Sequence, residues 1–472
     1  MIPSTGKIDR LLVELRPRLQ CANFFISFPR KFADIESTTI ELATDRITIV
    51  MKGERERYEI RTGDYFQLHT QTLSSLVIKN RYICFRVNTN ESVFGSERLS
   101  TGQAMQDEEP CRLACNVEAC KKYRVLCNNC GGPLVEQPSD QDEPGISFNR
   151  VLELPSEQLD TDDWFCHRHD HHPSDGAQQD ASCQGESSAQ LSTKFEPQQH
   201  DLFYGTFYAL LHRSILQRVH IRNERFVYCK RCLQYLGTTR KNRSSVKLWY
   251  ESVRFQPERS IPLALFRADD ALELFHHLVR KTVREFNFVT HLGLPPSIKL
   301  MFELRRPGME GDVFYLLMQI MDCQLSVFRA KQKRTASGSS ESCSDDVDDD
   351  RGKSVDPETE LLPSNRGGVA DGTAGDEEGN DDDDDDVFIE NAYRKHTIKL
   401  ERHRAMKLMY QYEKYDEQPL YVFWREDSNV VNLELSEPMF SAAVRYLDAN
   451  SSYVPECYRV NLGFSMSYLD IS

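Results

Sequence analysis

The sequence predicts an α+β protein that is predominantly β, with a middle region clasped by cysteines. Short segments rich in β-branched and aromatic residues recur along the chain and are separated by turn residues. Two Cys-x-x-Cys pairs stand about a hundred residues apart, and two stretches near the C-terminus have helical periodicity. We therefore expect an N-terminal β-rich domain (1–110), a zinc-clasped region (111–255) and a C-terminal domain (256–472) that contains two helices.

The N-terminal domain is predicted to be an antiparallel sheet. Its strands are expected at 11–15, 23–28, 46–51, 75–79 and 82–87, where β-branched and aromatic residues predominate. Cys21 and Cys84 fall within or beside these strands, and we expect both to fill core positions, because a free cysteine usually behaves as a small buried hydrophobe.

The C-terminal domain is predicted to combine a sheet with two helices. Asp269 or Asp270 can cap a helix that runs through the apolar positions 272, 275, 278 and 283. A second helix is expected over Glu437–Asp448, and strands are expected at 298–304, 313–327 and 460–469. A disordered acidic insert, 331–392, interrupts this domain, and a polar loop, 173–199, is expected to be disordered in the middle region.

The net charge of −15 belongs to the insert. Residues 341–386 hold nineteen acidic and three basic residues, so the rest of the chain is close to neutral and we expect no direct nucleic-acid partner. The N-terminus has no apolar signal segment, and no run reaches the roughly 20 apolar residues that span a bilayer. We expect an intracellular protein, cytoplasmic and nuclear, with no membrane partner.

Cys127, Cys130, Cys229 and Cys232 are the predicted metal ligands. In a reducing compartment, paired cysteines favour metal binding over disulfides, and four thiolates form the closed tetrahedral set of a structural zinc site. Cys166 and His167 are alternative ligands for one position. Two unrelated pairs, or a redox motif, are the other interpretations. The spacing of Cys111, Cys115 and Cys120 favours one face of a helix over a further metal knuckle.

Motifs for nucleotide binding, serine hydrolases and zinc proteases are absent from the sequence. Cys457 is the one cysteine after the insert and the candidate nucleophile. Its neighbours Glu456 and Arg459 act in opposite directions on a thiolate, so packing or a simple surface thiol is the alternative interpretation.

Five motifs in order resemble those of one family, the HECT-like ubiquitin-conjugating-enzyme-binding proteins, which are classed among the ubiquitin-protein ligases. The motifs are Cys127-x-x-Cys130-Gly, Arg150-Val-Leu-x-Leu-Pro-Ser-Glu157, Trp164-x-Cys166-His167, Cys229-Lys-Arg-Cys232 with Gly237, and Glu258-Arg-Ser-x-Pro262. They cover about 127–265, and the N-terminal strands and the closing strand are collinear with the family pattern.

The resemblance implies a protein that binds a ubiquitin-conjugating enzyme and promotes ubiquitin transfer. It places the contact just after the second cysteine pair, at Glu258, Arg259, Ser260, Pro262, Leu263 and Leu265 and at the helix face with Leu272 and Phe275. Ubiquitin, a cyclin and the endonuclease of messenger-RNA 3′-end processing are the further partners that it implies. A scaffold or chaperone for that endonuclease is therefore the alternative, non-catalytic function.

The sequence departs from HECT and RING ligases at their defining motifs. It has no Thr-Cys motif near the C-terminus, and it lacks the eight spaced ligands of a RING. The enzyme activity, a ubiquitin-protein transfer, therefore stays open in the sequence, whereas partner binding is the firmer expectation.

Overall fold

The computed structural model describes most of the chain. The described residues are 8–16, 19–32, 38–90, 113–135, 145–157, 196–240, 244–268, 270–289, 298–307, 313–330, 393–414, 419–427 and 429–471. The predicted insert 331–392, the alternative ligands Cys166 and His167, and residues 173–195 of the predicted loop lie outside them. The last part of that loop is anchored, because Glu196 accepts hydrogen bonds from Arg240 and Ser244.

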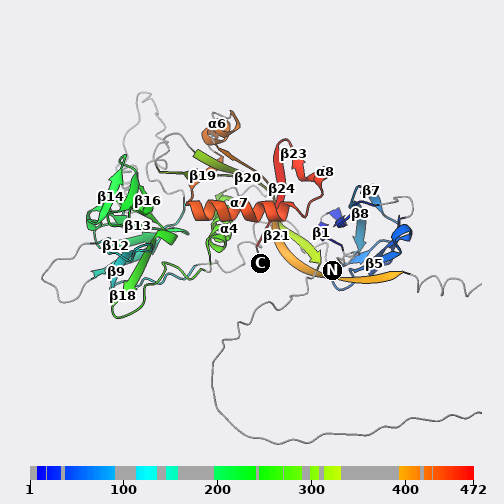
Figure 1. Cartoon of the computed structure of the whole chain (residues 1–472), viewed down its shortest axis with the longest axis horizontal. Coiled ribbons are helices and arrows are strands. Elements are labelled where there is room, and N and C mark those ends of the chain that lie inside the picture. Colours follow the sequence, from blue (N-terminus) through cyan, green and yellow to red (C-terminus); the bar gives the residue numbers. More distant parts are fainter. Residues whose placement is uncertain are drawn as a thin grey trace, which may run out of the picture.

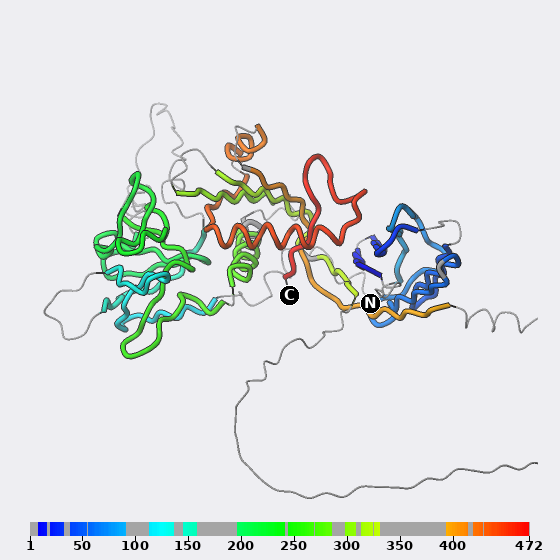
Figure 2. The backbone as a smooth tube through the Cα atoms, viewed as in Figure 1, coloured from blue at the N-terminus to red at the C-terminus, as the bar shows by residue number. Residues whose placement is uncertain are grey.

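Two long antiparallel strands, β20 (Val313–Ala330) and β21 (Arg394–Lys414), form the spine of a 14-stranded sheet. At one end β20 pairs with β1 (Arg10–Arg16) and β21 with β5 (Glu56–Arg61); at the other end their partners are β19 (Ile298–Arg305) and β24 (Phe464–Asp470). The backbone trace shows the N-terminal strands joined in this way to the C-terminal part of the chain (Figures 1 and 2). The first and third predicted domains therefore share one sheet.

The N-terminal strands form around a core of their own. Besides β1 and β5 they are β2 (Cys21–Ser27), β3 (Thr38–Leu42), β4 (Arg46–Met51), β6 (Gln67–Leu68), β7 (Ser74–Lys79) and β8 (Tyr82–Asn90). The five predicted strands form, as β1, β2, β4, β7 and β8, whereas β3, β5 and β6 were not expected from the sequence. Their pairing with one another is antiparallel, whereas β5 meets β21 in parallel. Cys21 and Cys84 are buried, as expected.

The middle region contains two smaller sheets. One has three strands, β10 (Ile146–Ser147), β9 (Lys122–Cys127) and β18 (Val253–Pro257). The other has seven, β11 (Arg150–Glu153), β12 (Asp201–Tyr204), β13 (Tyr208–His212), β17 (Ser245–Trp249), β16 (Tyr235–Thr239), β15 (Phe226–Cys229) and β14 (Val219–Arg222). Short 3-10 turns lie at Lys52–Glu54, Arg213–Ile215 and Tyr250–Ser252.

Four helices lie in the described residues: α4 (Ala271–Val289), α6 (Pro419–Glu426), α7 (Glu437–Ser451) and α8 (Glu456–Arg459). Asp270 caps α4 as predicted, since its Oδ1 accepts hydrogen bonds from the backbone N–H groups of Leu272 and Glu273. The helices α6 and α8 were not expected from the sequence. No helix among the described residues has the length and hydropathy of a bilayer-spanning segment.

Two local predictions are wrong. The stretch with Cys115 and Cys120 is not helical: Cys115 forms an isolated bridge with Phe266, and Cys120 has a φ of 63°. The final predicted strand, 460–469, is a hairpin of β23 (Val460–Asn461) and β24. Its turn is Leu462–Gly463, where both φ values are positive.

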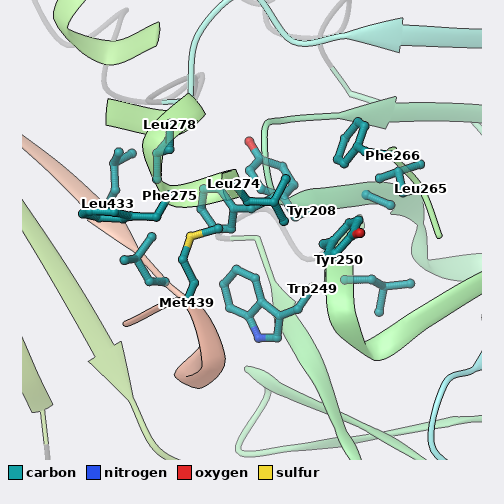
Figure 3. Packing of buried hydrophobic residues seen from close by; sticks show 14 of the residues in the cluster. Tyr208, Trp249, Tyr250, Leu265, Phe266, Leu274, Phe275, Leu278, Leu433 and Met439 are labelled. Carbon is teal, nitrogen blue, oxygen red and sulfur yellow. The ribbon is translucent and has the colours of Figure 1, made fainter. Parts of the chain in front are cut away.

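One large core joins the middle region to the C-terminal part. Trp249, the last residue of β17, and Tyr250, in the turn that follows it, face α4. The apolar side of α4 meets Leu433 on β22 (Val430–Glu434) and Met439 in α7 (Figure 3). This continuous packing gives the middle region a defined position against the long sheet.

Candidate metal centre and partner-binding hairpin

The four predicted cysteines converge on one point. Their Sγ atoms all lie within 4.8 Å of one another. Cys127 Sγ is 3.7 Å from Cys232 Sγ, and Cys130 Sγ is 3.8 Å from Cys229 Sγ. These separations are far longer than a disulfide bond of about 2.05 Å, and they leave room for an ion between the sulfurs.

The two knuckles have the same backbone construction. Each begins on the last residue of a strand, Cys127 on β9 and Cys229 on β15. The N–H group of Gly131 donates to Cys127 O and that of Leu233 donates to Cys229 O, both over 2.9 Å. Both donors have left-handed backbones, with φ of 64° and 58°. Glycine adopts this conformation without strain, but leucine does not.

The pKa shifts differ between the buried Cys127 and Cys229 and the half-buried Cys232. Burial raises the pKa of Cys127 to about 12 and also raises the pKa of Cys229, although backbone N–H groups of each turn point at these sulfurs. Burial would raise the pKa of Cys232 as well, but hydrogen bonds from the Gln234 N–H and the Asn129 side chain outweigh it and lower that pKa to about 6. A cation among the four sulfurs would stabilise the thiolates that burial disfavours.

This arrangement can hold a metal ion. Four thiolates at the corners of a tetrahedron are the donor set of a closed structural site, with no position open to substrate. The site joins the three-stranded sheet, through β9, to the seven-stranded sheet, through β15. A metal ion bound here would therefore act structurally, because it would tie two sheets together across a span of about a hundred residues.

The predicted contact residues after the second knuckle form a hairpin tip at residues 257–263. Phe255 and Leu263 exchange two backbone hydrogen bonds of 2.8 Å, and Ser260 N donates to Pro257 O. Gln256 Nε2 donates to Ser260 O, which ties the tip to the preceding strand.

The tip presents a mixed surface. Glu258, Arg259, Ser260 and Pro262 are all exposed, and Leu263 is half-buried. Ile261 lies among them and is 76% exposed. Ile261 is not among the contact residues expected from the sequence; the signal that could have identified it is a large aliphatic residue within an otherwise polar turn.

The remaining predicted contact residues lie elsewhere. Leu265 and Phe275 are fully buried in the core that joins the middle region to α4, so they have no surface to offer a partner (Figure 3). Leu272 is half-buried and packs at the edge of the same core.

The clasp and the hairpin tip lie at opposite ends of β18. In the antiparallel register Val253 pairs with Cys127, at the metal end, and Pro257 pairs with Tyr123 at the far end. The clasp therefore anchors the strand that carries the tip but does not contact the tip.

Cys457 lies in α8 and is exposed. The helix rests on the N-terminal sheet, where Tyr82 donates a hydrogen bond to Glu456 and the rings of Phe25 and Tyr458 meet edge to face. Arg459 donates to Val454 O, which holds its guanidinium beside the preceding turn. The thiol is accessible, and it is remote in sequence from both the clasp and the hairpin.

One of three comparisons with known proteins gives a match. No curated protein and no solved structure gives a significant match to the chain. One family model, described as HECT-like ubiquitin-conjugating enzyme (E2)-binding, matches residues 14–466. The match includes the N-terminal strands, both knuckles, the hairpin and the long sheet. The chain therefore belongs to the family of HECT-like proteins that bind ubiquitin-conjugating enzymes.

Proposed function

We propose that this protein binds a ubiquitin-conjugating enzyme and promotes transfer of ubiquitin from it, in the manner of a ubiquitin-protein ligase. The observation that carries the proposal is the family match, which covers nearly the whole chain. The description of the matching family does not mention a cyclin or an endonuclease as a partner.

The hairpin tip 257–263 is the proposed contact. Its two backbone hydrogen bonds hold its shape before binding, so little conformational entropy is lost when a partner docks. Ile261 supplies an apolar anchor, and Glu258 and Arg259 flank it with one charge of each sign. Apolar anchors within a polar rim are the usual centre of a binding surface.

Zinc is the proposed ion of the clasp. Four thiolates favour a soft or borderline cation over magnesium or calcium, and zinc accepts tetrahedral sulfur ligation without redox change. Its role here would be to hold β9 and β15 together and so to support β18. No step of ubiquitin transfer passes through it.

Binding can be tested with purified full-length protein and a panel of conjugating enzymes. We expect at least one enzyme to bind, and Ile261→Asp to weaken that binding about tenfold or more, since a carboxylate would replace the apolar anchor. Leu462→Asp is the matched control, because Leu462 is 93% exposed on the distant β23–β24 turn. If Ile261→Asp and Leu462→Asp bind the enzyme equally well, the hairpin is not part of the interface. If the native protein binds no conjugating enzyme, the proposal is refuted.

A further inference from the structure

Strands β4, β5 and β21 pair side by side in the long sheet, and Figure 1 shows β5 beside the first part of β21. Their outer side chains form a surface rich in basic residues. Ile49, Tyr58 and Ile60 point into the N-terminal core. Because side chains alternate along a strand, their neighbours occupy the outer face. The basic residues of that face, here called the basic face, are Arg46, Arg57, Arg61, Lys395 and Lys399.

Like charges lie directly opposite one another on the basic face. Arg61 pairs across the strands with Arg46 on one side and Lys399 on the other, and Arg57 pairs with Lys395. Such cross-strand pairs are destabilising unless counter-charges are near.

Acidic neighbours lie beside two residues of this face, Arg46 and Arg61. The Glu59 carboxylate forms ion pairs with two guanidinium groups, of Arg61 at 2.9 Å and of Arg46 at 3.8 Å. The Asp45 carboxylate forms a third pair, at 3.3 Å from Arg46. Arg46 and Arg61 nevertheless keep side-chain exposures of 46% and 56%. The basic face is therefore open to an anionic partner.

The acidic segment of the chain is close to this face in sequence and has the opposite charge. Residues 331–392 connect the end of β20 to the start of β21, and Ala330 pairs with Leu400, the neighbour of Lys399. Within that connection, 341–386 carries a net charge of −16, with six consecutive aspartates at 381–386. The last of these aspartates, Asp386, is eight positions before Arg394, the first residue of β21.

We infer that the basic face is a docking surface for the acidic segment 371–390 of the same chain. Tethering at both ends gives this segment a millimolar effective concentration, so weak charge pairing is enough to keep it bound. Any other polyanion must displace it. The acidic segment therefore confers selectivity on a surface that would otherwise bind nucleic acid or acidic proteins without discrimination.

The test uses fluorescence anisotropy of a labelled peptide of residues 371–390 with full-length proteins. The native chain should bind the peptide weakly, because its own segment occupies the face. A variant with Asp381–Asp386 replaced by asparagine should bind at least about tenfold more tightly, with an affinity that falls as salt rises. No gain in this variant would overturn the inference.

Charge variants then locate the surface within the asparagine-substituted chain. R61E/K399E should abolish peptide binding, whereas R222E/K122E, which changes the same net charge on exposed strands of the middle region, should leave it unchanged. If R61E/K399E does not fold, R61Q/K399Q provides the milder form of the test. If R61E/K399E and R222E/K122E lose peptide binding equally, the assignment is contradicted. It is also contradicted if the asparagine-substituted chain binds a labelled single-stranded RNA tightly but does not bind the peptide.

Discussion

Replacing Cys127 by serine should release the metal and loosen the middle region. The clasp closes a loop of about a hundred residues, because Cys127 and Cys232 are 105 positions apart. By the chain-entropy model for a cross-link, closing such a loop is worth about 4.7 kcal/mol. A domain is usually stable by only about 5–15 kcal/mol, so this loss is a large share of the total. We expect Cys127→Ser to bind less than half of the zinc and to unfold at a temperature more than about 10 °C lower.

Elemental analysis together with thermal unfolding, with and without a chelator, measures both effects. Cys120→Ser is the matched control, because Cys120 is exposed and lies outside the four-sulfur cluster. Chelator should lower the unfolding temperature of the control and of the native chain to that of Cys127→Ser. Equal zinc content and equal stability in the two variants would refute the clasp.

Three further changes test local features of the fold. Gly131→Ala should cost about 1–2 kcal/mol, because φ is 64° while no atom lies within 4 Å of the new Cβ; Leu233→Ala, at the equivalent position of the other knuckle, should cost much less. Lys407→Met should cost about 3 kcal/mol in denaturant unfolding, since it removes one of the two cations that compensate the buried Glu14 carboxylate and leaves only Arg16, at 3.1 Å. Burial raises the pKa of Glu285 to about 7, so its contribution to stability should be complete below about pH 4.5 and lost as the pH rises to 7; Glu285→Gln should remove that slope.

Local structure was largely readable from the sequence. Five of the eight strands in the first hundred residues, the cap at Asp270 and the two knuckles were predicted, because each depends on neighbouring residues and so on composition and spacing. The four sulfurs could be grouped because a Cys-x-x-Cys turn predicts the same geometry wherever it occurs.

The pairing of strands that are far apart in the chain could not be predicted from the sequence. Nothing in β1 or β5 indicates that these strands join β20 and β21, more than three hundred residues away, so the predicted first and third domains gave no hint of a shared sheet. The hairpin turn at Leu462–Gly463 had a signal in its glycine, but the apolar residues on both sides favoured one strand. Burial of Leu265 and Phe275 depends on how α4 packs, which the sequence of the segment alone does not specify.

Single-turnover discharge of a ubiquitin-charged conjugating enzyme tests the central proposal most directly. The native protein should accelerate loss of the thioester, and Ile261→Asp should slow it in proportion to lost binding. On non-reducing gels, a ubiquitin adduct that is absent from Cys457→Ser would assign the transfer to that thiol; equal discharge by Cys457→Ser would assign it to recruitment alone. Discharge no faster than the uncatalysed rate, for the native chain with every enzyme that binds it, would contradict the ligase function.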